Sequence, residues 1–127
     1  MIGGRTLRQI VRKRILDQVP ALTGVYDKAT ESSNHPYASL GPSDAVNESV
    51  ECIKAANISL QIDIWHDTNK GIVEDLVEAV FLALDGYEDT AVLTMHPISV
   101  IQTQVVDDPS GDYHGIVRIE VDTERNG

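Results

Sequence analysis

The sequence predicts an α+β domain: an antiparallel sheet of about four strands, two helices packed on one face, and a long loop or hairpin arm. Two segments, 5–19 and 71–84, repeat apolar residues at helical spacing. Two others, 57–66 and 113–121, alternate apolar and polar residues as half-buried strands do. A chain of 127 residues is the usual length of one domain, so we expect residues 1–127 to form one.

The first helix is predicted over residues 5–19. Its apolar residues recur at intervals of three and four and therefore share one face: Leu7, Ile10, Val11 and Ile15. Pro20 ends the segment, because the residue before a proline resists the helical conformation. The opposite face carries Arg5, Arg8 and Arg12.

Charge is distributed unevenly along the chain, whose formal net charge is −10. Residues 1–20 hold five basic residues against one acid, a net of +4, and the remaining 107 hold five against nineteen, a net of −14. Such an acidic body repels phosphates, so general nucleic-acid binding is not expected. The stripe formed by Arg5, Arg8 and Arg12 is either a solvated helix face or a subunit interface that meets the acidic body of a second copy.

Residues 35–42 form a short extended piece bracketed by prolines, which indicates an edge strand or a connector. Residues 43–56 follow neither the helical nor the strand period and are interpreted as a mobile loop or a long hairpin arm. They include apolar residues that a solvated loop does not need. We therefore expect the arm to be mobile in the free subunit and ordered on assembly, with Val46, Val50 and Ile53 as candidate contacts.

The clearest strand is predicted over residues 57–66. Its apolar residues all fall on one face: Ile58, Leu60, Ile62 and Ile64. Trp65 falls on the polar face, where it either packs on a neighbouring strand or helix end or anchors an interface.

A second helix and a hairpin complete the prediction. Asp67-Thr68-Asn69 offers capping side chains before the helix over 71–84, and Gly86 suits its end. Residues 92–106 contain an extended stretch from Pro97 to Val106, residues 107–112 have turn composition, and a strand follows over 113–121.

No motif for catalysis is present, and we expect no catalytic, cofactor-binding or metal-binding residues. The doublet His66-Asp67 lacks the further ligands that a metal phosphohydrolase needs. Asp107, Asp108 and Asp112 do not match calcium-loop spacing. Cys52 is the single cysteine and has no evident base beside it. The sequence also has neither a secretory h-region nor an apolar run of the ~18 residues that a membrane helix needs.

The order of these segments resembles the tail-completion or tail-terminator proteins of long-tailed bacteriophages, prophages and gene transfer agents. The resemblance runs from about Leu7 to Val121 and rests on short motifs: Pro36-Tyr37-Ala38-Ser39-Leu40-Gly41, Ile62-Asp63-Ile64-Trp65 and Asp108-Pro109-Ser110-Gly111-Asp112-Tyr113-His114-Gly115-Ile116-Val117-Arg118. The chain departs from the family in the arm, where residues 43–56 lack the aromatic and threonine that members often carry.

The resemblance implies a structural virion protein, assembled in the bacterial cytoplasm and located at the head-tail junction. Its members form a ring, usually of six subunits, which caps the tail tube and joins it to the head. The implied partners are further copies of the chain, the tail tube protein and a head-tail connector or stopper protein. DNA would pass through the channel without specific binding, and no membrane is involved.

Three alternatives remain open from the sequence. The first is a head-tail stopper or minor tail protein of the same particle. The second is a small non-enzymatic cytosolic adaptor or ligand-binding domain. The third is an enzyme that uses His66 and Asp67.

Overall fold

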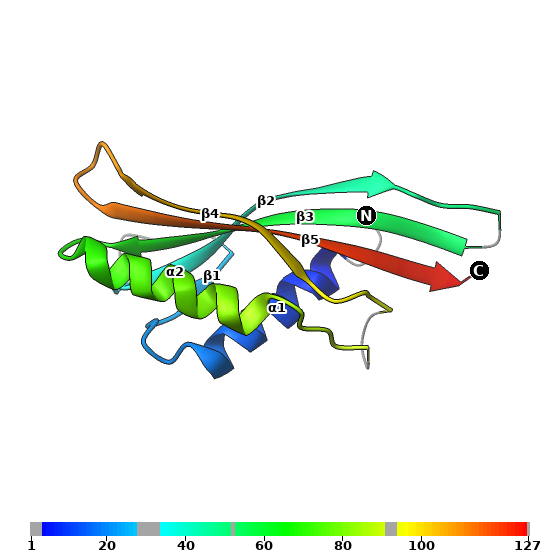
Figure 1. Cartoon of the computed structure of the whole chain (residues 1–127), viewed down its shortest axis with the longest axis horizontal. Helices are drawn as coiled ribbons and strands as arrows, with labels where there is room; N and C mark the ends of the chain where they lie inside the picture. Colours follow the sequence, from blue (N-terminus) through cyan, green and yellow to red (C-terminus); the bar gives the residue numbers. More distant parts are fainter. Residues whose placement is uncertain (1–3, 28–33, 52, 91–93, 127) are drawn as a thin grey trace.

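The computed structural model describes residues 4–27, 34–51, 53–90 and 94–126. In chain order its elements are α1 (Gly4–Gln18), β1 (Val25–Tyr26), β2 (Tyr37–Asn47), β3 (Ile53–His66), α2 (Lys70–Leu84), β4 (Ser99–Asp107) and β5 (Tyr113–Asn126). The strands form one sheet in the order β1-β2-β3-β5-β4. Both helices lie on the same face of the sheet, and within the described residues the other face carries no helix (Figure 1).

The predicted α+β architecture with two helices on one face is confirmed, with two corrections to the sheet. It has five strands rather than about four, and it is mixed rather than antiparallel. Both differences come from β1, which pairs in parallel with β2 through Val25 opposite Ala38 and Tyr26 opposite Ser39. A strand of two residues is too short to show a period, so the sequence pattern does not reveal it.

Both helices form where the apolar spacing predicts them. The four apolar residues expected on the inner face of α1 are all buried. Asn69 caps α2, because its side-chain oxygen accepts a hydrogen bond from the backbone N–H of Ile72 at 3.2 Å. The chain leaves α2 through Gly86, whose φ of +80° is a conformation that favours glycine.

The core lies between the helices and the central strands. On β3 the predicted inward residues are at most 2% exposed: Ile58, Leu60, Ile62 and Ile64. They pair across the sheet with β5, where Val117, Ile119 and Val121 are equally buried. Gly115 on β5 permits the closest approach of α2, because a Cβ there would lie 2.5 Å from Cγ2 of Val77.

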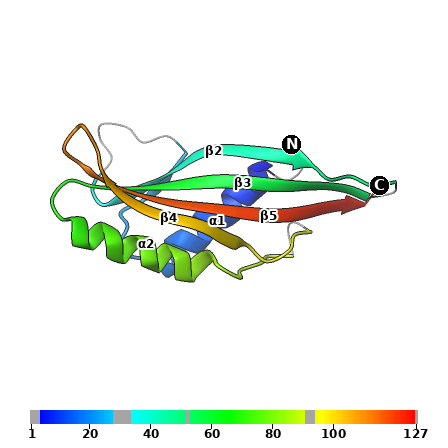
Figure 2. The same ribbon diagram turned by 45° about the horizontal axis from the view of Figure 1, so that its top comes forward.

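The arm over residues 43–56 is the far end of the β2–β3 hairpin, so the hairpin interpretation is correct and the loop interpretation is not. Residues 43–47 belong to β2 and residues 53–56 to β3, and both strands are longer than predicted. Val50 and Ile53 exchange two backbone hydrogen bonds, of 3.0 and 2.8 Å, near the tip. The arm projects past both helices (Figures 1 and 2). Its side chains have no buried face to alternate against, which is why the strand period is absent. Cys52 lies outside the described residues.

The second hairpin is confirmed. Its turn is held by the N–H of Asp108 bonded to the carbonyl of Asp112, and by Gly111 with a φ of +98°. β5 runs to Asn126, beyond the predicted end at 121, and β4 spans Ser99–Asp107, so it begins two residues after the predicted start at Pro97 and ends one residue later than predicted. Residues 92 and 93 of that stretch lie outside the described part of the chain. Met95 and Ile98 are buried and close the core beside Thr123.

Candidate functional site

Arg8 and Arg12 attach α1 to the sheet of its own chain. Arg8 donates from Nη2 to the carbonyl of Gly41 at 2.8 Å and to Oγ of Ser43 at 3.2 Å. It donates from Nη1 to the carbonyl of Leu40 at 3.4 Å and lies 3.6 Å from the Asp27 carboxylate. Sequence reasoning missed this role, because every residue carries a carbonyl and no pattern marks the ones that accept.

Two further arginines donate to backbone carbonyls, Arg12 to one on β1 and Arg14 to one on α2. Arg12 donates from Nε to the carbonyl of Val25 at 2.8 Å. Arg14 donates from Nε to the carbonyl of Ala83 at 2.8 Å, and its guanidinium stacks 4.2 Å from the centre of the Tyr87 ring. Arg5 is exposed. The stripe is therefore partly structural, and its role between subunits stays a prediction.

The contacts of Arg8 and Arg12 also place basic residues of α1 beside one edge of the sheet. Arg8 and Arg12 reach β1 and β2, so the basic flank, defined as Arg5, Arg8 and Arg12, runs beside that edge. On the other edge, Lys70 lies 3.3 Å from Asp107 at the end of β4. Glu74 and Glu78 follow Lys70 at intervals of four on α2, so they share its flank, and both are exposed. We name Glu74 and Glu78 the acidic flank.

Carboxylates gather on the helix-free face, where the arm joins the sheet. Three adjacent rows of paired residues carry them: Asp44, Ser59 and Glu120; Val46, Asn57 and Asp122; Glu48, Ala55 and Glu124. The acidic patch is defined as Asp44, Glu48, Glu120, Asp122 and Glu124. Residues spaced by two on a strand point to the same side, so all five face away from the helices.

The surroundings of Glu48 in the acidic patch affect the pKa of its carboxyl. Desolvation raises this pKa above its ordinary value, and the charges of Asp122 and Glu120 and a side-chain hydrogen bond with Asp122 raise it further. Asp122 also accepts a hydrogen bond from the side-chain amide of Asn57 at 3.0 Å. Clustered like charges oppose folding, so stability of the single subunit does not explain the patch.

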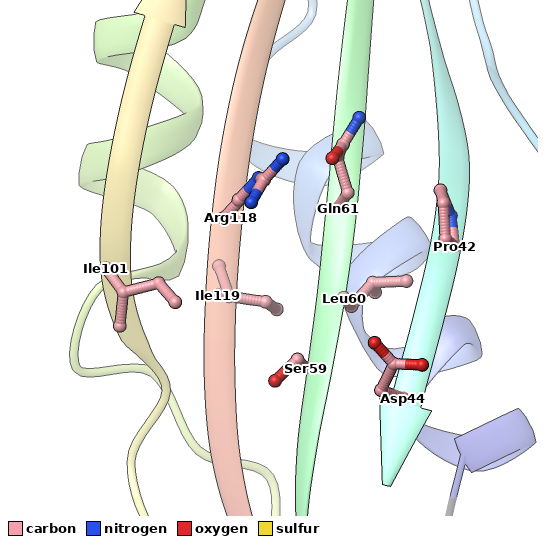
Figure 3. A pocket seen from close by; sticks show the side chains of 8 residues that line it. All are labelled: Pro42, Asp44, Ser59, Leu60, Gln61, Ile101, Arg118 and Ile119. Carbon is pink, nitrogen blue, oxygen red and sulfur yellow. The ribbon is translucent and has the colours of Figure 1, made fainter.

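A shallow depression of about 340 Å³ lies beside the acidic patch on the same face (Figure 3). It spans four strands, from Pro42 on β2 to Ile101 on β4, and the helices lie behind the sheet in this view. Arg118 stands in the row next to Glu120 and places a cation at its rim. Ile101 is 52% exposed although it belongs to a strand.

Trp65 packs within its own chain on the helix-free face. Its ring stacks on that of His114, with the centroids 3.9 Å apart and the planes at 9°, and its Nε1 donates to Oγ of Ser39 at 3.3 Å. Nε2 of His114 lies 2.7 Å from Oδ1 of Asp63, which also accepts from the Gln61 amide at 2.8 Å. Packing on a neighbouring strand was one of the two interpretations of Trp65, and its role as an interface anchor stays a prediction.

The doublet of His66 and Asp67 lies at the end of β3, next to His35. The Nδ1 of His66 is 3.6 Å from Asp67, too far for a hydrogen bond, and its Nε2 bonds to the Thr68 hydroxyl at 3.0 Å. Burial and the charge of Asp112 raise the pKa of the neighbouring Tyr37. Among the described residues, no group of three or more His, Cys, Asp or Glu side chains is placed to hold a metal ion. Within the same residues, no helix combines the length and hydrophobicity needed to span a membrane.

Three apolar side chains of the arm are exposed. Val46 is 62% exposed, Val50 64% and Ile53 37%. Together with the basic flank and Trp65, these residues are the candidate contacts that the sequence predicts. The structure places them on the arm, which lies away from the core.

Comparison with known proteins identifies the family to which the chain belongs. Residues 6–124 match the family model described as tail completion protein gp17. No curated protein sequence matches. A chain in the virion of a native gene transfer agent particle has a similar fold, with a TM-score of 0.73 and 17% identity over 90% of this chain and 94% of that one. The gp17 protein of bacteriophage SPP1 is similar at a TM-score of 0.60 and 18% identity, over 97% and 92%. This chain therefore belongs to the tail completion protein gp17 family, the structural proteins of phage-like virion tails.

Proposed function

We propose that this chain is the tail terminator of its particle, a ring of six subunits that caps the tail tube and joins the tail to the head. The observation that carries the proposal is the pair of unlike charged edges on one subunit. A closed ring needs two different surfaces on each subunit, because each copy meets one neighbour on either side. The basic flank and the acidic flank supply such a pair.

The acidic patch supports a channel role for the helix-free face. Five carboxylates over three rows of the sheet repel DNA phosphates, so DNA would slide past this face without specific binding. On this proposal the acidic patch faces the channel.

The arm is the proposed contact with a neighbouring subunit or with the tail tube protein. Val46, Val50 and Ile53 are exposed in the single subunit, and their burial on assembly would offset the cost of ordering the arm. The head-tail connector or stopper protein would meet the opposite rim of the ring. The half-buried Trp65 is a further proposed contact.

The test is to assemble particles without this chain. The terminator role predicts filled heads and tails that remain separate, and tubes whose ends lack a ring in electron micrographs. Adding the purified protein should restore the end ring and the joining. Native mass spectrometry of the purified protein gives the number of subunits.

Two outcomes would reject the proposal. One is normally joined particles in the absence of the chain. The other is a location on the head connector instead of the tube end, which would identify a stopper.

A further inference from the structure

We propose that successive copies of this chain pair edge to edge, with β4 of one copy antiparallel to residues 43–47 of β2 in the next, so that one sheet continues around the assembly. This inference deepens the proposed ring and rests on it. It says which strand pairs with each of the two sheet edges that a single subunit leaves open.

The first open edge is β4. Within the described residues, β4 forms its ladder with β5 on one side and is the last strand of the sheet. Residues 99–106 contain no charged residue, proline or glycine, and Ile101 is 52% exposed. Edge strands of proteins that stay apart usually carry lysine or proline, which block pairing. The composition of β4 is that of a strand which pairs.

The second open edge is the outer side of β2. β1 covers β2 only at Ala38 and Ser39. Beyond the irregularity between Leu40 and Ser43, the stretch from Ser43 to Asn47 forms its ladder with β3 alone in the described part of the chain. The outward N–H and C=O groups of residues 43–47 can exchange hydrogen bonds with those on the open edge of β4.

Strand directions fit this pairing. β2 is antiparallel to β3, β3 to β5, and β5 to β4, so β2 and β4 run in opposite directions. Through β5 and β3, Ser99 of β4 lies in the same row as Asp44 of β2, so β4 reaches residues 43–47 of the next copy only when the strands are inclined to the ring axis, as they are in closed barrels. In that arrangement β4 of one copy meets β2 of the next in antiparallel orientation. The helices of all copies then stay on one side of the continuous sheet.

The charged residues favour pairing of β4 with β2 of a neighbour over pairing of β4 with β4. The acidic flank runs beside β4 and the basic flank beside β2, so head-to-tail pairing brings Glu74 and Glu78 toward Arg5 and Arg12 of the neighbour. Pairing β4 with β4 would instead bring two acidic flanks together. The partner is therefore the β2 edge of a second copy.

Cysteine crosslinking tests the pairing. In a Cys52→Ser background, Val46→Cys is combined in turn with Ser99→Cys, Gln102→Cys and Gln104→Cys. These four positions all lie on the helix-free side of the sheet, and testing three partners covers different staggers between copies. At least one pair should give a ladder of crosslinked chains under non-reducing electrophoresis, ending at the mass of the ring. Ala45→Cys with the same three partners is the matched control, because Ala45 points to the helix side and should crosslink several-fold less.

Native mass spectrometry of each variant separates this inference from the proposed function. A ring without a crosslink in any of the three pairs overturns the edge pairing and leaves the terminator role intact. Crosslinked chains of open-ended length support the edge pairing and count against a closed ring. Protein that forms neither rings nor crosslinks overturns both.

Discussion

The two halves of strand β3 differ in what holds them. From Ile58 to Ile64 every second side chain is buried in the core, whereas Ile53, Lys54 and Ala55 lie in the arm with little burial. The covered half is held by packing, and the arm by backbone pairing and by the hydrogen bonds that Ser49 makes with Asn47 and Ala55. This difference teaches that hydrophobic burial sets stability in one half and leaves the other half available for assembly.

The largest expected effect comes from one substitution made in both halves. Ile62→Ala should lower the free energy of unfolding by about 2–5 kcal/mol, because Ile62 is fully buried and a cavity would remain. Ile53→Ala on the same strand should cost less than about 1 kcal/mol, since Ile53 is 37% exposed. Urea unfolding of the monomer measures both, and equal losses would show that the arm packs like the core.

A close contact in the covered half gives the next effect. Gly115→Ala should cost about 1–3 kcal/mol, because the new Cβ would lie 2.5 Å from Val77 and 3.0 Å from Val73 on α2. Val77→Ala in the Gly115→Ala background makes room and should recover part of that loss in thermal unfolding. A neutral Gly115→Ala variant would contradict the close packing of α2 on β5.

The arginines of α1 separate stability from assembly. Arg8→Ala should cost about 1–2 kcal/mol, because the carbonyl of Gly41 and the hydroxyl of Ser43 lose a charged donor. Arg5→Ala, at an exposed position, should stay within about 0.5 kcal/mol in chemical unfolding but weaken assembly at low salt. Unchanged stability of the Arg8→Ala monomer would show that the hydrogen bonds from Arg8 contribute nothing.

The smallest expected effect lies in the acidic patch. The folded-state pKa of Glu48 is raised, so its charge opposes folding above that pKa, and this penalty disappears as the pH falls through it. Glu48→Gln should therefore raise the melting temperature slightly at pH 7 and leave it unchanged near pH 3. High salt should shrink the gain at pH 7. A lower melting temperature at pH 7 would contradict repulsion from Asp122 and Glu120.

Much of the fold can be predicted from the sequence, because the covered half is periodic. Apolar residues spaced by three and four predict each end of α1 and α2 to within one residue. The alternation of apolar and polar residues identifies the buried face of β3. The Asp-Pro-Ser-Gly-Asp turn marks the second hairpin, since each of these residues favours a turn for a local reason. Local sequence patterns are enough to predict an element wherever burial of one face imposes a period.

The arm and the candidate assembly surfaces required the tertiary structure. Pairing of 43–47 with β3, the parallel contact of β1 and the carbonyls bound by Arg8 and Arg12 all join residues distant in sequence. The acidic patch is likewise split between β2 and β5, which meet only through the register of β3. Sequence by itself determined the elements that bury an apolar face, because burial leaves a period in the chain. Only the tertiary structure decided which edges stay open and which charges gather beside them. Backbone hydrogen bonds and long-range register leave no periodic pattern in the sequence.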